Sequence, residues 1–469
     1  MVEQGPSRRR LLASAGACAA WAAGLLATPA QAETTTGEAT VGEVVVTATR
    51  REQILQSVPA SITALDSRQI EGRQLLQAHD LVFQSPGLVM GAFGSANLPS
   101  IRGISHESTS GTEDPSVAVY VDGVYQSRPR AIDIVTTDLE RVEVLRGPQG
   151  TLYGRNATGG TINFITKAPS AAPEGEVSLL RGNYDRTQVR AIFSSPLSED
   201  LGFRIGALYN NRAKGYTKNL LAGAPDSSIE TQETYGLRAK LAYAPSDALD
   251  VMVGAHYVRQ AYTPALQMIT PPGPGPFQAA FNAGAYTTRP HRVFSDVDHN
   301  GHLISGGATL TGQWKLAPSL SLRLISAYQE IDQAERLDSD TSSRFLAIQN
   351  RRDDAITWTH EFNLHGTFLD DRLDLLLGAF YLSERISADN ILPFPVFGLT
   401  SPGLVFRATQ RGSSRSVFGD FTYRVTERFR VYGGARATWD KKAIGQYQQA
   451  GVVTCPNIRA KDSWHAFAP

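Results

Sequence analysis

The sequence predicts a mainly β protein, in which an N-terminal mixed α/β domain is followed by a transmembrane antiparallel β-barrel. Three observations predict this fold class. The chain opens with an export signal, residues beyond 175 alternate between apolar and polar, and the connections there are either very short or very long. After the signal, no stretch approaches the roughly 18 apolar residues of a membrane helix. If the chain crosses a membrane, it does so with strands.

Residues 1–32 have the parts of a signal peptide. Three arginines at positions 8–10 precede an apolar run over residues 11–26, and Ala30 and Ala32 fit a small-residue cleavage site. The arginines fit a twin-arginine signal and an ordinary one about equally, so the export route stays open. We therefore expect an exported protein that begins after Ala32.

Charge and cysteine content narrow the possible partners. The 469 residues include 45 basic and 45 acidic side chains, so there is no positive excess to neutralise phosphates, and we expect no nucleic-acid partner.

Cys455 is the only cysteine outside the signal. A lone thiol in an exported protein is either free or lacks its partner, and both readings stay open.

Residues 41–168 are predicted to form the mixed α/β domain. A helix is expected through Ile70, Leu75 and Leu81, capped by Asp66 or Ser67. The dipeptide at 122–123, Asp-Gly, is a signal for a two-residue hairpin turn. Strands are expected over residues 44–46, 60–65, 117–121, 142–145 and 161–166.

A glycine-rich stretch in this domain nearly matches a phosphate-binding loop. Gly154, Gly159, Gly160 and Thr161 follow the pattern G-x-x-x-x-G-K-[ST], but Gly160 replaces the lysine. A phosphate loop must open a helix, whereas the residues after Gly160 alternate as in a strand. We interpret the glycines as tight turns with positive φ between two strands.

Beyond residue 175 the pattern is that of barrel strands. Apolar residues recur at every second position, and several stripes begin or end in an aromatic residue, as in lipid-facing strands with interfacial girdles. A soluble sandwich also alternates, but its turns seldom divide into two lengths. Short connections are expected at 245–247, 318–319, 370–371 and 426–427, and long ones at 213–231, 261–301, 332–353, 387–412 and 441–461.

Counting from Glu176, eleven strands and the start of a twelfth at 463–467 are expected. An open sheet edge is not stable in lipid, so we expect the reading frame to continue beyond Pro469.

Four motifs make residues 42–168 resemble the plug domain of TonB-dependent outer-membrane receptors. They are Gly-Glu-Val-Val-Val-Thr-Ala at 42–48, Ser-Ile-Arg-Gly at 100–103, Val-Tyr-Val-Asp-Gly-Val at 119–124, and Leu-Arg-Gly-Pro with Leu-Tyr-Gly within 145–154. The resemblance implies an N-terminal segment (33–50), a plug (51–168) and the first part of a barrel (169–469). The family's barrel has 22 strands, of which about 11–12 are present here.

The resemblance also implies a function. Such a receptor lies in the outer membrane of a Gram-negative bacterium, in contact with its lipid, and actively imports a scarce ligand of the siderophore type or another large solute. TonB, with ExbB and ExbD in the inner membrane, transmits the energy of the proton gradient. No covalent chemistry and no cofactor are implied. Alternatives are a passive pore, which needs neither plug nor TonB-binding segment, and an exported soluble β-rich binding protein or enzyme.

Individual residues follow from the resemblance. The TonB box comprises Val44, Val45, Val46, Thr47 and Ala48, and it would bind by adding a strand to its partner's sheet. Arg102 and Arg146 match plug arginines that pair with barrel carboxylates, with Glu361 as a candidate partner, although solvated lumenal charges are the alternative. Ligand contacts are expected where loops meet the plug, at Phe93, Asn97, His106 and Glu107.

Signals for a metal or a catalytic site are incomplete. Residues 296–301 open like a calcium loop, D-x-D-x-N-G, but the glutamate due at the twelfth position is Gly307. There is no H-E-x-x-H spacing and no nucleophile elbow. We expect no metal site, and we expect that the protein is not an enzyme.

Overall fold

We describe the protein from a computed structural model. The structure describes residues 45–47, 50–51, 53–58, 60–75, 77–93, 96–105, 112–128, 137–266, 282–394, 399–450, 453–454 and 457–468. The signal peptide, Val44, Ala48, His106, Glu107 and Cys455 lie outside these residues. Residues 44–469 form one compact unit.

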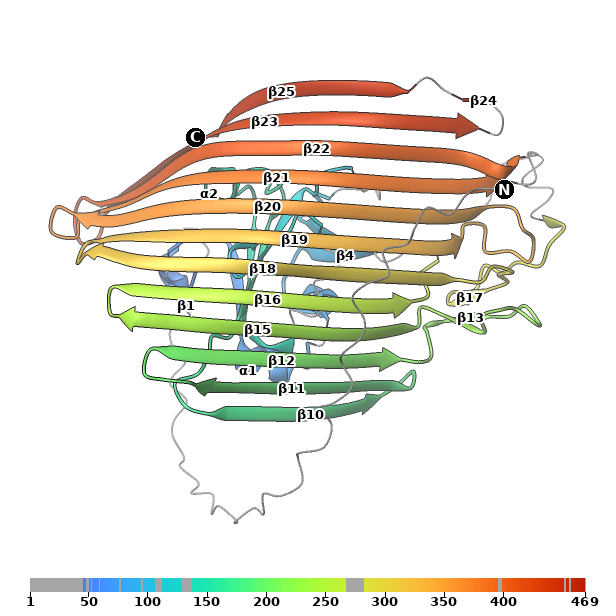
Figure 1. Ribbon diagram of the computed structural model, residues 1–469, viewed down its shortest axis with the longest axis horizontal. Coiled ribbons are helices and arrows are strands. Elements are labelled where there is room, and N and C mark those ends of the chain that lie inside the picture. Colours follow the sequence, from blue (N-terminus) through green and yellow to red (C-terminus); the bar gives the residue numbers. More distant parts are fainter. Residues whose placement is uncertain are drawn as a thin grey trace, which may run out of the picture. The chain divides into compact units, whose positions relative to one another are not determined.

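A long antiparallel sheet, here called the wall, dominates this unit (Figure 1). Twelve consecutive strands pair with their neighbours, and a two-residue strand, β24 (Val453–Thr454), extends one hairpin. The expected antiparallel barrel sheet and its number of strands are confirmed. The twelve are β10 (Glu174–Gly182), β11 (Arg186–Pro196), β12 (Leu201–Arg212), β15 (Gln232–Ser246), β16 (Leu249–Tyr262), β18 (Asn300–Ala317), β19 (Leu320–Asp338), β20 (Ile348–Phe368), β21 (Leu373–Phe394), β22 (Leu399–Arg424), β23 (Arg430–Ala450) and β25 (Ile458–Ala468).

The two faces of the wall differ in chemistry, as the alternation predicts. On β20, Phe362 is 49% exposed on the outer face while its neighbour Glu361 is 3% exposed on the inner face. Leu237, Leu241 and Trp439 are likewise exposed, whereas the inward Arg204 and Lys240 are buried. Successive side chains of a strand point to opposite faces, so one face suits lipid and the other a polar lumen.

The connections at the two ends of the strands differ in length. The short turns are confirmed between β15 and β16, β18 and β19, β20 and β21, and β22 and β23. The expected long loops at 332–353, 387–412 and 441–461 are wrong in their character, because strands β19 to β25 run on through most of them. A membrane crossing takes about 9–11 residues, so these hairpins project far beyond the bilayer.

Two other long connections carry a small sheet of their own. It contains β13 (Thr217–Asn219), β14 (Ser228–Ile229) and β17 (Arg292–Val293), and β13 pairs with β17 in parallel. The sheet joins the β12–β15 connection to the β16–β18 connection.

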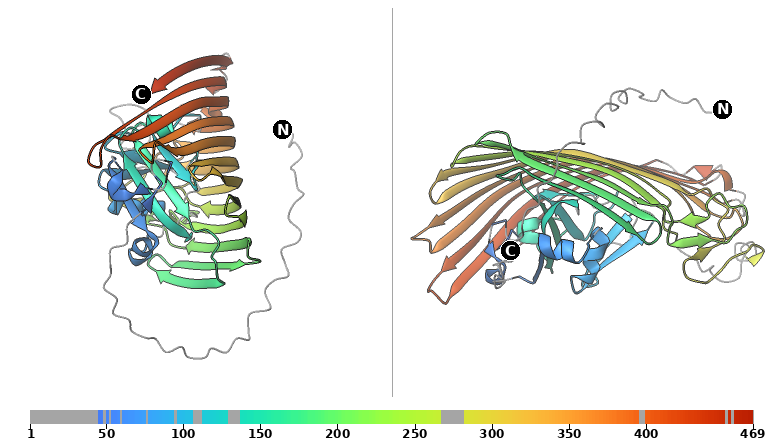
Figure 2. Two further views of the ribbon diagram at one scale, coloured as in Figure 1. Left: turned by 90° about the vertical axis from the view of Figure 1, so that its left-hand side faces the viewer. Right: turned by 90° about the horizontal axis from the view of Figure 1, so that it is seen from below.

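The N-terminal domain packs against the concave face of the wall (Figure 2). Its five-stranded sheet has the order β3-β8-β9-β6-β7, with an apolar core that includes Leu65, Ile101, Val119 and Phe164. These strands are β3 (Ile62–Asp66), β8 (Leu139–Arg146), β9 (Gly160–Thr166), β6 (Val117–Val121) and β7 (Val124–Tyr125). Two separate hairpins are β1 (Val45–Val46) with β2 (Gln53–Ile54), and β4 (Leu88–Phe93) with β5 (Ala96–Ile101).

The helix expected through residues 70–81 is interrupted. Asp66 caps α1 (Ser67–Gly72) in a capping box with Gln69, but the helix ends after one and a half turns. Gln74 has a φ of 51°, which no helix interior allows, and the 3₁₀ helix η2 (Ala78–Phe83) follows. A second 3₁₀ helix, η1, spans Leu55–Ser57. No described helix is long and apolar enough to cross a membrane.

The glycine-rich stretch forms turns, as predicted. The short helix α2 (Gly150–Tyr153) precedes Gly154 rather than following Gly160, and Gly160 begins β9. A Cβ at Gly160 would lie 2.2 Å from the carbonyl oxygen of Leu145. The nucleotide alternative is therefore wrong, because no helix terminus faces the place of a phosphate.

Candidate functional site

The strand β1 binds to the N-terminal domain along one edge. Val45 and Val46 pair with Ile54 and Gln53 of β2, and within the described residues β1 has no second partner strand. Val46 is fully buried in a core with Val58 and Tyr120, whereas Val45 is 43% exposed. An edge strand of this kind offers free main-chain groups to an added strand.

Thr47 fixes the end of β1 to a buried carboxylate. Its backbone N–H donates to Glu143 Oε1 at 2.8 Å, and its hydroxyl donates to the same oxygen at 3.2 Å. Glu143 is fully buried on β8 and also accepts from Arg141 Nε at 2.9 Å. Charge-assisted hydrogen bonds thus hold Thr47, and with it the end of β1, to the plug.

Arg50 connects the N-terminal domain to the wall. Its Nη2 lies 3.1 Å from Glu361 Oε2 on β20, and both side chains are buried. Its guanidinium lies over the rings of Tyr120 and Tyr153, at 4.8 and 4.6 Å from their centroids. Burial disfavours the charged guanidinium, but Glu361, Tyr120 and Tyr153 together outweigh burial, and the pKa of Arg50 is raised.

Arg51 makes the next contact with the wall. Its buried side chain forms ion pairs with Asp374 and Asp420. Asp374 is the second residue of β21 and follows a short turn, so this contact lies at the short-turn end of the wall. We call Arg50, Arg51 and their three carboxylate partners the N-terminal anchor.

Three further aspartates of the N-terminal domain pair with the wall. Asp138 binds Arg204 of β12 at 2.6 and 2.7 Å, and Asp122 lies 3.2 Å from Lys240 of β15. Asp114 accepts from Lys442 of β23 at 2.6 Å and pairs with Arg155 at 2.7 Å. Burial raises the pKa of Asp114, but these two cations outweigh it, and its pKa is lowered.

The predicted contact residues are only partly brought together. Glu361 does contact the N-terminal domain, but its partner is Arg50, so the pairing expected with Arg102 or Arg146 is corrected. Neither arginine forms an ion pair with any described residue; Arg102 is exposed in a turn with φ of 53°, and Arg146 Nε is buried without a partner. Which plug arginine pairs with Glu361 depends on which segment of the plug lies beside β20 in the folded protein.

The predicted ligand contacts remain predictions. Phe93 and Asn97 lie at the closed end of the β4–β5 hairpin, where Phe93 pairs with Ala96 and Asn97 with Ala92. His106 and Glu107 lie outside the described residues, as do Val44 and Ala48 of the predicted TonB box.

The connections at the end of the wall opposite the short turns contain a buried polar cluster. It places a serine, a histidine and an aspartate in a row, as in a catalytic triad, but it lacks the chemistry of one. His299 lies between Ser295 Oγ and Asp226 Oδ2, at 3.2 Å from each. Ser295 is fully buried, and its hydroxyl donates to Asp338 Oδ2 at 2.6 Å. The Ser295 hydroxyl is buried away from any substrate, so we interpret the cluster as one that orders the loops.

The same region includes the incomplete calcium motif. Asn300 and Gly301 of this motif begin β18 and are paired along the wall. Among the described residues no three histidine, cysteine or acidic side chains are grouped to hold a metal ion.

Comparison with known proteins points to one family. Residues 54–161 match the family described as TonB-dependent Receptor Plug Domain. The pesticin receptor of Yersinia pestis is 26% identical over 444 residues, which cover 90% of this chain and 59% of that receptor. The iron-regulated outer membrane virulence protein of Vibrio cholerae is 30% identical over 180 residues, covering 34% of this chain and 26% of that protein.

Solved structures share the fold. The ferric yersiniabactin uptake receptor FyuA from Yersinia pestis superposes with a TM-score of 0.73 at 22% identity, covering 87% of this chain and 61% of that one. The ferric-catecholate import receptor Fiu of Escherichia coli K12 superposes with a TM-score of 0.65 at 16% identity, covering 89% and 67%. The chain spans 59% of the length of the pesticin receptors it matches.

Proposed function

We propose that this chain, which belongs to the TonB-dependent outer-membrane receptors, takes part in the energised import of a scarce ligand across the bacterial outer membrane. TonB, acting with ExbB and ExbD, would deliver the energy of the inner-membrane proton gradient. The observation that carries the proposal is a pair of contacts near the N-terminus. The edge strand β1 ends at Val46, and four positions later Arg50 and Arg51 reach three carboxylates of the wall.

This arrangement suits a mechanism in which TonB binds β1 and pulls on it. Arg50 is three positions after Thr47, a span of at most about 10 Å when extended. Force applied to β1 therefore acts first on the buried Val46 and on Thr47, and next on the N-terminal anchor. Withdrawing Val46 from its core costs about 1.5–3 kcal/mol, and the buried ion pairs resist further displacement.

The ligand class is proposed by similarity. The relatives are named for ferric chelate uptake or for regulation by iron, which supports a ligand of the siderophore type. The projecting hairpins of β19 to β22 and the β4–β5 hairpin, with Phe93 and Asn97, would form its binding surface. No covalent step is proposed, because binding and displacement of the plug account for the import.

The test uses two substitutions at one position of the full-length receptor. Val45→Pro removes a backbone donor and disfavours a sheet ladder, whereas Val45→Ala keeps the backbone. We expect unchanged ligand affinity in both variants, uptake lost with proline, and uptake largely kept with alanine. Radiolabelled ferric-chelate uptake by intact cells, with equilibrium binding measured at low temperature, would report both quantities.

Ala39→Pro, a proline six positions before Val45, is the matched control and should leave uptake unchanged. Equal uptake by the wild type and Val45→Pro would show that β1 is an ordinary strand of the plug, and energised transport through this segment would be rejected. Uptake that survives loss of the proton gradient would instead favour a passive pore.

A further inference from the structure

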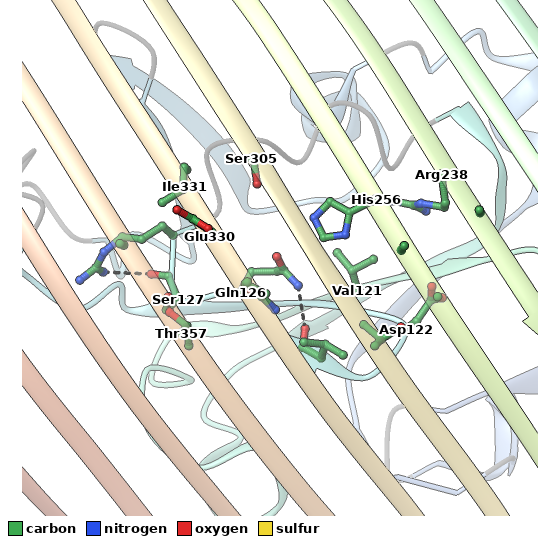
Figure 3. A pocket seen from close by; sticks show the side chains of 18 of the residues that line it. Val121, Asp122, Gln126, Ser127, Arg238, His256, Ser305, Glu330, Ile331 and Thr357 are labelled. Carbon is green, nitrogen blue, oxygen red and sulfur yellow. Dashed lines mark hydrogen bonds between the residues drawn. The ribbon is translucent and has the colours of Figure 1, made fainter. Parts of the chain in front are cut away.

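A cavity lies between the plug and the middle of the wall, and the charged or titratable residues of its lining are four basic ones and two acids. It offers about 70 Å³ to the centres of water molecules, enough for several waters or one small polyatomic ion, since one water needs about 10–15 Å³. Strands β15, β16, β18, β19 and β20 line it on one side, and the β6–β7 hairpin lines it on the other (Figure 3).

Two of the lining residues face each other directly. Arg238 of β15 and His256 of β16 are paired across the ladder, and both point toward the lumen. Figure 3 shows them on adjacent strands, with Val121 and Asp122 of the plug hairpin nearby. A guanidinium beside an imidazole presents neighbouring N–H donors on the lumenal face of these two strands.

Both acids in the lining, Glu330 and Asp122, already have partners. Glu330 Oε2 accepts from the Tyr328 hydroxyl at 2.7 Å. Asp122 Oδ2 accepts from the Thr166 hydroxyl at 2.7 Å and lies 3.2 Å from Lys240 Nζ, and Oδ1 accepts from the Thr166 N–H at 2.8 Å. Burial opposes its charge, but Lys240 and then Arg238 outweigh burial and lower the pKa of Asp122. Asp122 and Lys240 therefore neutralise each other, and the charge of Arg238 has no counter-charge of its own in the lining.

Arg238 has no partner of its own among the described residues. It forms no ion pair there, and its Nη1 atom is buried without a hydrogen bond. Arg128 also lines the cavity, and its Nε and Nη2 atoms are buried and unpaired in the same part of the chain. Buried guanidinium donors without acceptors are costly, which indicates that an acceptor occupies the cavity in solution.

We propose that this cavity binds a small oxyanion, a carboxylate or a phosphate, with Arg238 as its principal ligand and His256 and Arg128 beside it. A planar guanidinium matches both anions with two parallel donors. The cavity volume restricts the anion to the size of phosphate or acetate. The site is independent of the transported ligand and does not require that transport occur.

The test is phosphate binding to the purified full-length receptor in detergent micelles, followed by line broadening in ³¹P NMR. We expect saturable broadening in the wild type and at least about tenfold weaker binding in Arg238→Gln, the loss of one charge-assisted hydrogen bond. Arg212→Gln is the matched control. Arg212 also points inward, but its donors are taken by the Glu230 carbonyl and the Tyr216 hydroxyl.

A second measurement locates the anion and controls for folding. A selenate soak of receptor crystals should give an anomalous peak beside Arg238 that is absent in Arg238→Gln. In phosphate-free buffer this variant should melt at or above the wild-type temperature, because it removes an uncompensated buried charge. Equal broadening in the wild type and Arg238→Gln, or a cavity with water density alone, would overturn the proposal. Acetate in place of phosphate tests whether carboxylates bind there too.

Discussion

Arg50 Nη2 lies 3.1 Å from Glu361 Oε2, and this buried pair joins the N-terminal segment to β20, the eighth strand of the wall. The guanidinium is also stacked on Tyr120 and Tyr153 of the plug. One side chain therefore fixes the start of the plug, its core and the wall at the same time.

Removing Glu361 should loosen this connection. Glu361→Gln leaves the buried Arg50 without its counter-charge, and breaking such a pair costs roughly 3–5 kcal/mol. We expect hydrogen exchange of residues 45–58 to accelerate about a hundredfold or more. Arg50→Lys should rescue less than its charge suggests, because lysine cannot stack as a plane on two rings. Mass spectrometry of exchanged peptides measures both.

Arg146→Ala is the control for that experiment. Arg146 has no ion pair with a described residue, so its removal should change exchange in residues 45–58 little. Comparable acceleration in both variants would show that Arg146, as the family resemblance implies, also connects the plug to the wall.

Arg51 should control access to β1 from the short-turn side. Val46 is fully buried, so a cysteine there, in a Cys455→Ser background, should react slowly with a membrane-impermeant maleimide. Arg51→Ala removes the ion pairs with Asp374 and Asp420 and should increase the labelling rate about tenfold or more. Arg68→Ala, an exposed arginine on α1, should leave the rate unchanged. Equal rates in the two variants would contradict the anchoring role of Arg51.

Gly154 should not tolerate a side chain. Its φ is 76°, and a Cβ there would lie 2.6 Å from the guanidinium carbon of Arg436 on β23. Gly154→Ala should lower the free energy of unfolding by about 1–3 kcal/mol through backbone strain alone, which thermal melting in micelles would detect. Gly150→Ala is the matched control, because its Cβ would meet Ala468 at 3.8 Å, an ordinary contact. If both variants melt together, the close approach of Arg436 does not constrain this turn.

The loop cluster around Asp338 should loosen at alkaline pH. Asp338 ends β19, beyond the length that a membrane crossing takes, and burial together with the neighbouring Asp340 raises its pKa to about 8. The folded pKa lies above the unfolded value near 4. Protonated Asp338 thus contributes fully to the stability of the loop cluster below pH 4, and this contribution is lost as the pH rises through 8.

Proteolysis reports this change. Cleavage within residues 338–347 should be faster at pH 9 than at pH 7, and Asp338→Asn, which cannot ionise, should remove the difference. Asp370→Asn, in a short turn, controls for a general effect of charge removal. A pH dependence that persists in Asp338→Asn would assign it to other groups.

Local sequence patterns are sufficient to predict the strands of this protein, the faces of those strands and the tight turns. The alternation of Glu361 with Phe362 assigns each side chain to the lumen or to lipid, because neighbouring residues of a strand face opposite sides wherever the strand lies. Asp122 and Gly123 have φ values of 50° and 84°, the tight turn that their identities predict. The wall, its short turns and the strand after Gly160 follow from such local signals.

The tertiary structure alone decided which charges meet. Arg51 and Asp374 are 323 residues apart in sequence, and no local pattern indicates that they pair. The family resemblance predicts Arg102 or Arg146 as the partner of Glu361, but the wall brings that strand to Arg50 instead. The cavity beside Arg238 likewise exists only because β15 and β16 pass the β6–β7 hairpin. A strand's faces are determined by its own residues, whereas ion pairs and cavities depend on the register and curvature that all strands of the wall set together.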